Sequence, residues 1–138
     1  MITLNLLHPT TSKPVQTWIF ESQEKISIGR SQDNDVVVFS AVVSRYHLEL
    51  HQQNTDWEII SSGSNGTFCD NQLITQMTVE NGMIIRLGDT GPKLSIWLGV
   101  LSPEQRGKTV LPKQSSSKNS TNTATYKSTY ITNPISGE

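Results

Sequence analysis

Two short stretches of this 138-residue chain group side chains that could bind an ion or take part in catalysis. The first, SRYHLELH, runs from Ser44 to His51 and holds a serine, an arginine and two histidines. The second, GSNGTF, begins at Gly63 and places Ser64 and Asn65 in a glycine-containing turn. Three kinds of site use such residues: a metal centre, a Ser–His hydrolase site and a pocket for an anion.

The spacing of the histidines argues against a metal centre. His47 and His51 are four residues apart, which on a helix would bring both side chains to one ion. The leucines between them alternate with polar residues, however, as they do in a strand. Four residues of a strand span about 13 Å, whereas a Zn–N bond is about 2 Å long. We therefore expect no metal ion, and the sequence indicates no other cofactor.

A hydrolase site is disfavoured because its further parts are missing. Ser44 and His47 could be pictured as nucleophile and base. A triad also needs an orienting acid and oxyanion donors, and the chain has no G-x-S-x-G nucleophile elbow. A serine three residues before a histidine, at the start of a strand, more often forms a structural hydrogen bond. We expect the protein not to be an enzyme.

An anion pocket needs the groups that three segments of the chain offer together. Gly29-Arg30 ends one apolar run, Ser44-Arg45 precedes another, and Ser64-Asn65 lies in a third turn. The next residue, Gly66, can adopt a positive φ at little cost. A phosphate is bound by a guanidinium fork, hydroxyl groups and backbone N–H groups on separate rigid supports. The sequence therefore predicts an anion site built from three loops.

Short runs with period-two alternation must position these loops. The runs are MITLNLL, VQTWIFE, KISIGR, DVVVF, YHLELHQ, DWEII, GTFCD, MIIRLG and KLSIWLGVL. Turn-forming segments rich in Gly, Pro, Asn and Asp separate them, and no window of a dozen residues has a helical period. Many short strands with regular turns predict an all-β protein, an antiparallel sandwich or barrel.

Composition divides the chain into a domain, residues 1–101, and a tail, residues 102–138. The domain has six Lys/Arg against ten Asp/Glu, a net charge of −4, and the tail has five against two, a net charge of +3. The acidic domain repels nucleic-acid phosphates, so we expect no nucleic-acid partner. The tail is rich in Ser, Thr, Asn and Lys, and this composition predicts a disordered tail or linker.

The N-terminus and the cysteine content bear on location. The single cysteine, Cys69, excludes an internal disulfide framework and fits a reducing compartment. The first residues, MITLNLLHP, lack a basic region, and their apolar run is too short for a signal peptide or a membrane span. We therefore expect a cytoplasmic protein with no membrane partner.

The chain resembles the forkhead-associated (FHA) domain family, whose β-sandwich members bind phosphothreonine peptides. The resemblance rests on Gly29-Arg30, Ser44-Arg45-x-His47 and Asn65-Gly66-Thr67, in this order and near the spacing of the family. It covers residues 1–101, with support from NDVVV, VSRYHLEL, NGTFCDNQLI and ENGMIIRLG. It implies an antiparallel sandwich of the FHA type, with about eleven strands, that acts as a phosphothreonine-dependent interaction module in Ser/Thr kinase signalling.

The resemblance also implies a role for each matching residue at the site. Arg30 would pair with the phosphate, Ser44 would donate its hydroxyl to it, and Arg45 would add a second cationic contact. Ser64 would take a phosphate-donor place that often holds Thr. Asn65 would form hydrogen bonds with the main chain of the bound peptide.

The other motif residues would support the site without touching the ligand. They are Gly29, His47, Gly66 and Thr67. The chain departs from the family pattern where it has Ser61 in place of the usual Asp, in a segment one residue shorter than the common form. In a later turn Asp70-Asn71 stands where the family often has glycine, and both residues tolerate the left-handed conformation.

The expected partner is a phosphothreonine-containing protein downstream of a Ser/Thr kinase, or the phosphorylated tail of the chain itself. Thr109 follows basic residues in RGKTVLP, as many kinases prefer. Thr132 has Ile135 three residues later, at a position that the family commonly reads. The alternative function is a phosphorylation-independent scaffold or an oligomerisation module.

Overall fold

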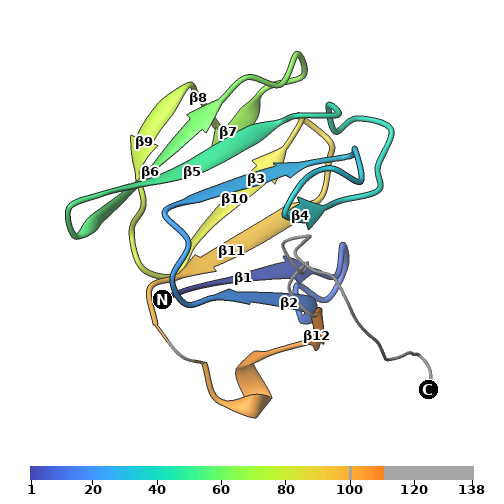
Figure 1. The fold of residues 1–138 in the computed structure, drawn as a ribbon. Helices are drawn as coiled ribbons and strands as arrows, with labels where there is room; N and C mark the ends of the chain where they lie inside the picture. The colour runs from blue at the N-terminus through green and yellow to red at the C-terminus, as the bar shows by residue number, and fades with distance from the viewer. Residues whose placement is uncertain (100, 111–138) are drawn as a thin grey trace, which may run out of the picture.

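Alternating apolar side chains build two β-sheets that pack face to face (Figure 1). The structure, a computed structural model, describes residues 1–99 and 101–110. In spatial order the seven-stranded sheet consists of β12 (Lys108–Val110), β2 (Pro14–Phe20), β1 (Ile2–Leu7), β11 (Lys93–Trp97), β10 (Met83–Leu87), β7 (Thr67–Cys69) and β8 (Gln72–Ile74). The five-stranded sheet consists of β4 (Val36–Val37), β3 (Lys25–Gly29), β5 (Leu48–Gln53), β6 (Asp56–Ser61) and β9 (Gln76–Thr78).

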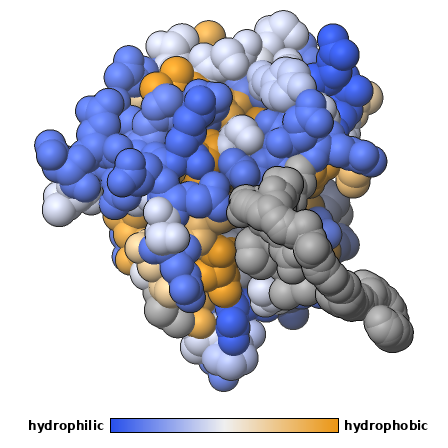
Figure 2. Space-filling view, viewed as in Figure 1, coloured by the Kyte–Doolittle hydropathy of each residue, from blue (hydrophilic) through white to orange (hydrophobic). Residues whose placement is uncertain are grey.

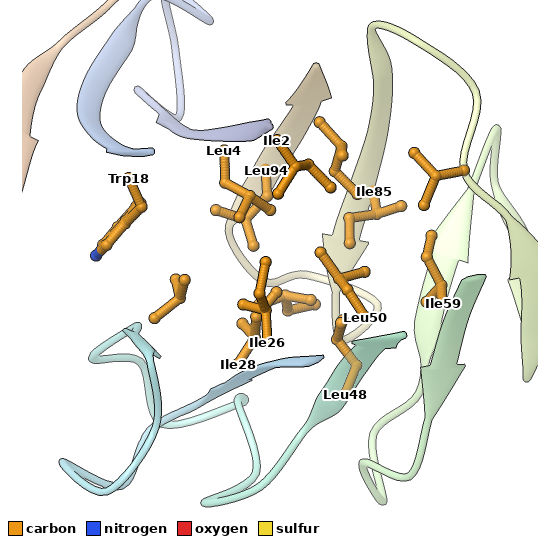
Figure 3. Close-up of a cluster of buried hydrophobic side chains, with 14 of the residues drawn as sticks. Ile2, Leu4, Trp18, Ile26, Ile28, Leu48, Leu50, Ile59, Ile85 and Leu94 are labelled. Atoms are coloured by element: carbon orange, nitrogen blue, oxygen red, sulfur yellow. The ribbon is translucent and has the colours of Figure 1, made fainter. Parts of the chain in front are cut away.

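The core lies between the two sheets and consists of side chains that the alternation predicts. Figure 3 shows aliphatic side chains from both sheets meeting there; those that are fully buried include Ile2, Leu4, Ile26, Ile28, Leu50, Ile59, Ile85 and Leu94. A slip of one residue in any of these strands would turn its apolar set towards water. The core therefore fixes the strand register, and with it the positions of the loops at the strand ends.

The expected all-β sandwich is confirmed, with twelve strands in the described residues and two parallel pairings beside the antiparallel ones. In one of them the segment 30–35 turns the chain back, so that the short β4 runs beside the end of β3 in the same direction. Asp70 and Asn71 have φ values of 52° and 63° in the turn between β7 and β8, as their tolerance of this conformation predicts.

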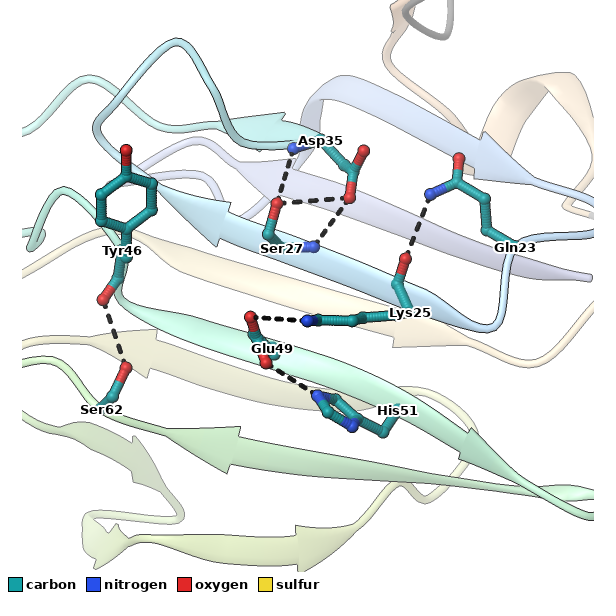
Figure 4. A network of polar contacts seen from close by, with 8 residues as sticks. All are labelled: Gln23, Lys25, Ser27, Asp35, Tyr46, Glu49, His51 and Ser62. Carbon is teal, nitrogen blue, oxygen red and sulfur yellow. Dashed lines mark hydrogen bonds and ion pairs between the residues drawn. The ribbon is translucent and has the colours of Figure 1, made fainter. Parts of the chain in front are cut away.

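Polar residues cover the outside of the five-stranded sheet. In Figure 2, hydrophilic residues occupy most of the region where β3, β5 and the neighbouring loops lie in Figure 1, and hydrophobic residues show mainly below them, towards the gap between the sheets. Lys25, Glu49 and His51 form one such polar group on adjacent strands (Figure 4). No helix in the described residues is long and apolar enough to cross a membrane.

The chain after residue 101 continues the domain, which differs from the boundary that we expected from composition. Residues 101–110, here called the C-terminal strap, contain the 3-10 helix η1 (Pro103–Gln105) and strand β12, which pairs with β2. Asn5 Nδ2 donates a hydrogen bond to the backbone oxygen of Gln105 at 3.1 Å. The backbone N–H of Gly107 donates to Thr17 Oγ1 at 2.8 Å. Residues 111–138, the rest of the expected tail, lie outside the described residues.

The strap satisfies polar groups that would otherwise lie unpaired on the outside of the seven-stranded sheet. Asn5 and Thr17 are almost completely buried and are joined by a hydrogen bond of 2.6 Å. Buried polar groups are stable only when they are hydrogen-bonded. Composition could not reveal the strap because polar contacts and one strand edge hold most of it, and its apolar contacts come from single residues at its ends, Leu101 and Val110.

Replacing Gly107 with alanine should displace the strap. A Cβ at this position would lie 2.3 Å from the backbone carbon of Val15, which cannot move without distorting β2. We expect Gly107→Ala to lower the free energy of unfolding by about 1–3 kcal/mol, measured by urea denaturation of residues 1–110. Lys108→Ala, an exposed change in the same segment, should change it by less than about 0.5 kcal/mol. Equal stability of Gly107→Ala and the parent would show that the strap contributes nothing to folding.

Candidate functional site

Three loops next to one another carry the residues that the sequence analysis selected. The first, residues 30–35, follows β3, and the second, residues 38–47, leads into β5. The third, residues 62–66, joins β6 in one sheet to β7 in the other. Each loop therefore begins or ends at a strand whose register the core fixes.

Backbone contacts hold the first two loops together. The N–H of Arg30 donates to the oxygen of Ser44 at 2.9 Å, and the N–H of Ser31 donates to the oxygen of Arg45 at 3.1 Å. A Cβ at Gly29 would lie only 2.2 Å from that oxygen of Arg45. This close approach requires glycine, because any larger residue would push the second loop away.

Asn34 is a supporting residue that the motif comparison missed. Its side chain is buried, and Nδ2 donates to the backbone oxygens of Ser31 at 2.8 Å and Arg45 at 2.7 Å. Its Oδ1 has no hydrogen-bond partner among the described residues. The available signal was its place at the start of NDVVV, which supported the family resemblance without giving Asn34 a role. Asn34 fixes the spacing of the two arginine-bearing loops.

His47 is completely buried and joins the second loop to the third. Its Nδ1 accepts a hydrogen bond from the N–H of Ser44 at 3.0 Å, and its Nε2 donates to the oxygen of Gly66 at 2.8 Å. The N–H groups of Ser62 and Gly63 both donate to the backbone oxygen of His47, at 2.9 and 2.8 Å. These partners require the neutral ring with its hydrogen on Nε2. No set of three His, Cys, Asp or Glu side chains in the described residues is placed to hold a metal ion.

Burial lowers the pKa of His47, and the hydrogen bond to Gly66 only partly opposes this effect. Between the lowered pKa and the unfolded value near 6.5, the unfolded chain binds more protons than the folded one. Stability is therefore fully present above about pH 6.5 and should be lost as the pH falls through the lower pKa. Urea unfolding from pH 7.5 to 4.5 checks this. His47→Gln should show a shallower loss than the parent, and identical slopes would contradict the assignment.

Polar side chains of the second and third loops lie beside one another. They belong to Ser44, Ser64 and Asn65. The Ser44 Oγ accepts a hydrogen bond from the N–H of Ser64 at 3.1 Å, and the two hydroxyl oxygens are 3.5 Å apart. Asn65 Nδ2 donates to the backbone oxygen of Val42 at 2.9 Å, which holds the second loop to the third. Ser64 and Asn65 are exposed and Ser44 is half-buried, so their polar groups can reach a ligand.

Arg30 and Arg45 are both exposed, on the first and second loops. Arg30 Nε donates to the backbone oxygen of Val43 at 3.0 Å, a contact that anchors the guanidinium group without using its two terminal nitrogens. Neither arginine forms an ion pair with a carboxylate within the described residues. Two unpaired guanidinium groups beside two hydroxyls are suited to an anion with several acceptor oxygens.

Gly66 and Thr67 support the third loop. Gly66 has a φ of 80°, and its oxygen accepts hydrogen bonds from His47 Nε2 and from the N–H of Gly88, both at 2.8 Å. Thr67 is buried, and its Oγ1 lies 2.8 Å from Ser61 Oγ. Ser61 therefore takes part in a hydrogen bond at the position where the family usually has Asp.

The structure does not bring Thr109 to these loops. Thr109 is exposed on β12, where it pairs with Thr17 at the edge of the seven-stranded sheet. Thr132 and Ile135 lie outside the described residues.

Comparison with known proteins shows similarity to the FHA domain. Residues 26–88, which contain all three loops, match the family model of the FHA domain. Over 74 residues the chain is 31% identical to the glycogen accumulation regulator GarA of Mycobacterium tuberculosis, a match that covers 49% of this chain and 46% of GarA. The chain thus spans about half the length of the curated relatives that it matches.

Solved structures have the same fold over most of the described residues. The FHA domain of FhaA, crystallised in complex with the intracellular domain of a second protein, is 25% identical with a TM-score of 0.57; the alignment covers 70% of this chain and 99% of that one. A domain from a study of phosphothreonine-dependent FHA interactions is also 25% identical, with a TM-score of 0.59 and coverage of 72% and 98%. Residues 26–88 therefore match the FHA domain in sequence, and the described residues share the fold of solved FHA domains.

Proposed function

We propose that the domain binds a phosphothreonine-containing segment of a partner protein with the three loops described above. The observation that carries the proposal is that three connected loops carry Arg30 and Arg45, neither in an ion pair with a described carboxylate, together with the adjacent hydroxyls of Ser44 and Ser64. The phosphothreonine-dependent interactions named for a structurally similar FHA domain support the same function here.

The chemistry of a phosphate ester fits these groups. Phosphorylation adds about −1.5 to −2 charges and three acceptor oxygens. Hydrogen bonds to a charged group contribute about 1.5–3 kcal/mol each. In the proposed complex, the terminal nitrogens of Arg30 and the Ser44 hydroxyl donate to the phosphate, with Arg45 and Ser64 adding further contacts. Asn65, already held by Val42, positions the main chain of the peptide.

We propose binding rather than catalysis because the one histidine in the loops cannot act as a base. Both ring nitrogens of His47 already have hydrogen-bond partners, and the ring has no contact with solvent. A general base needs a free nitrogen within reach of the substrate proton. The function therefore lies in recognition, downstream of a Ser/Thr kinase that creates the phosphothreonine.

The proposal is tested by measuring the affinity of residues 1–110 for peptides that differ only at the threonine position. A degenerate peptide library with a fixed phosphothreonine first selects a sequence, which is then made with phosphothreonine, phosphoserine and threonine. We expect micromolar binding of the first and no measurable binding of the third. The phosphoserine form should bind more weakly, by about tenfold or more, if a small pocket takes the threonine methyl group. Equal binding of phosphorylated and unmodified peptides would refute phosphate recognition.

The tail of the chain is a second candidate for the bound segment. A flexible stretch of about 30 residues has a root-mean-square span of about 30 Å, and tethering gives an effective concentration near the millimolar range. Thr132 is the better candidate than Thr109, because Thr109 would first have to leave the edge of β2. A phosphorylated peptide around Thr132 should bind more tightly than about 1 mM and lose this binding with Arg30→Ala; weaker binding would exclude self-recognition.

A groove beside the second loop favours the alternative function, a scaffold that does not need phosphorylation. It has a volume of about 940 Å³, and its lining includes Val38, Phe39 and Ser40. Phe39 is 75% exposed, which is unusual for so large an apolar side chain. A partner that still binds Arg30→Ala but is lost with Phe39→Ala would support the scaffold, whereas the reverse pattern supports phosphate recognition.

A further inference from the structure

The loops that carry the two arginines also contain a carboxylate, that of Asp33. Asp33 lies in the turn that Ser31 and Asn34 close through a backbone hydrogen bond of 3.2 Å. Its Oδ2 accepts a hydrogen bond from the hydroxyl of Tyr46 at 2.7 Å. Asp33 is exposed and forms no ion pair within the described part of the chain. Its negative charge is therefore held in place without being neutralised.

This charge belongs to the same two loops as the phosphate-binding groups. Asp33 follows Arg30 by three residues in the first loop, and Tyr46 directly follows Arg45 in the second. The side chain of Asn34 ties the backbones of these loops together, so the loops hold the four residues at fixed places relative to one another. The backbone oxygen of Tyr46 also accepts a hydrogen bond from Ser62 Oγ, drawn in Figure 4.

An uncompensated carboxylate at this place opposes the binding of a phosphate. Like charges repel over a range of about 8–10 Å at moderate ionic strength, and the bound phosphate adds nearly two negative charges. A ligand that also brings a positive charge to Asp33 removes this penalty and gains an ion pair. The free Oδ1 of Asp33 can accept a hydrogen bond from such a cation. The ring of Tyr46, 56% exposed, offers an aromatic face beside it.

On the basis of the proposed function, we propose that Asp33 and Tyr46 form a cation seat that selects a lysine or arginine close to the phosphothreonine of the partner. The domain then reads two features of one segment, the phosphate through Arg30 and Ser44 and a neighbouring basic residue through the cation seat. Segments of this kind arise where a kinase phosphorylates a threonine among basic residues.

A lysine scan locates the preferred position. The probes are phosphothreonine peptides with alanine flanks and one lysine at each of the four positions before and after the phosphothreonine. We expect lysine at one or two adjacent positions to strengthen binding to residues 1–110 by about 3- to 10-fold over the all-alanine peptide. Asp33→Asn should abolish this preference and should tighten binding of the all-alanine peptide at low salt. Tyr46→Phe, which keeps the ring, should reduce the preference only in part.

Asp56→Asn is the matched control because it removes one exposed carboxylate at the start of β6, beside the end of β5 that is remote from the loops. It should leave the lysine preference unchanged. Failure of every phosphothreonine peptide to bind would overturn both the proposed function and the cation seat. Binding without a lysine preference, or a preference that survives Asp33→Asn, would overturn the cation seat alone.

Discussion

Arg30→Ala should weaken binding of a phosphothreonine peptide by more than about 100-fold, with little effect on folding. The variant loses at least two charge-assisted hydrogen bonds to the phosphate, each with a contribution of about 1.5–3 kcal/mol. Folding should change little because Arg30 is exposed and, among the described residues, its side chain forms one hydrogen bond, from Nε to the oxygen of Val43. Isothermal titration with the selected peptide gives the affinity, and urea unfolding of the same sample gives the stability.

Arg30→Lys is the informative companion of this variant. Lysine keeps the charge but not the planar fork, and it has no equivalent of Nε to donate to Val43. We expect it to recover at most about tenfold of the lost affinity. If Arg30→Ala bound the peptide within about twofold of the parent, Arg30 would not be the phosphate ligand.

His47→Ala should lower the free energy of unfolding by about 2–5 kcal/mol. The change leaves the N–H of Ser44 without its acceptor, and each unpaired buried group costs about 1–3 kcal/mol. It also empties the space against which Gly63 packs, since a Cβ there would lie 2.5 Å from His47 Nδ1. Binding should weaken indirectly, because the loops that carry Ser44 and Ser64 lose their common support.

His51→Ala separates this structural effect from the mere loss of an imidazole. His51 is partly exposed, and its side-chain hydrogen bond goes to Glu49 at the surface. The change should cost less than about 1 kcal/mol. Equal costs for His47→Ala and His51→Ala would contradict the connecting role of His47. Stoichiometric zinc in the purified protein would reopen the metal site that the strand spacing excluded.

Local patterns predicted the sandwich because each strand shows its buried face in its own sequence. Leu48 and Leu50 alternate with polar neighbours and are both buried, as expected. The loop residues were predicted differently, by the order of their motifs, since Arg30, Ser44 and Asn65 have no periodicity of their own. The structure brings these three side chains to neighbouring loops, but their roles towards a ligand stay predictions.

Contacts between distant segments could not be predicted in this way. Asn34 and the backbone oxygen of Arg45 are eleven positions apart, and nothing in either segment indicates the other. The strap is a stronger case, because Gly107 and Thr17 are ninety positions apart and the strap has a tail-like composition. The pair of Asp33 and Tyr46 looked like ordinary surface residues until the first two loops were placed together.

The two hydrogen bonds to the backbone oxygen of Gly66 affect how the loops of the site separate during local unfolding. This oxygen accepts hydrogen bonds from both His47 Nε2 and the N–H of Gly88, so the turn after β10 is joined to the same point as the second loop. Displacement of Gly66 breaks both bonds, which couples the third loop to the second loop and to the turn after β10 in one unit of local opening. The amide protons of Ser44 and Gly88 should then exchange at similar rates, and a bound ligand should slow both by the same factor.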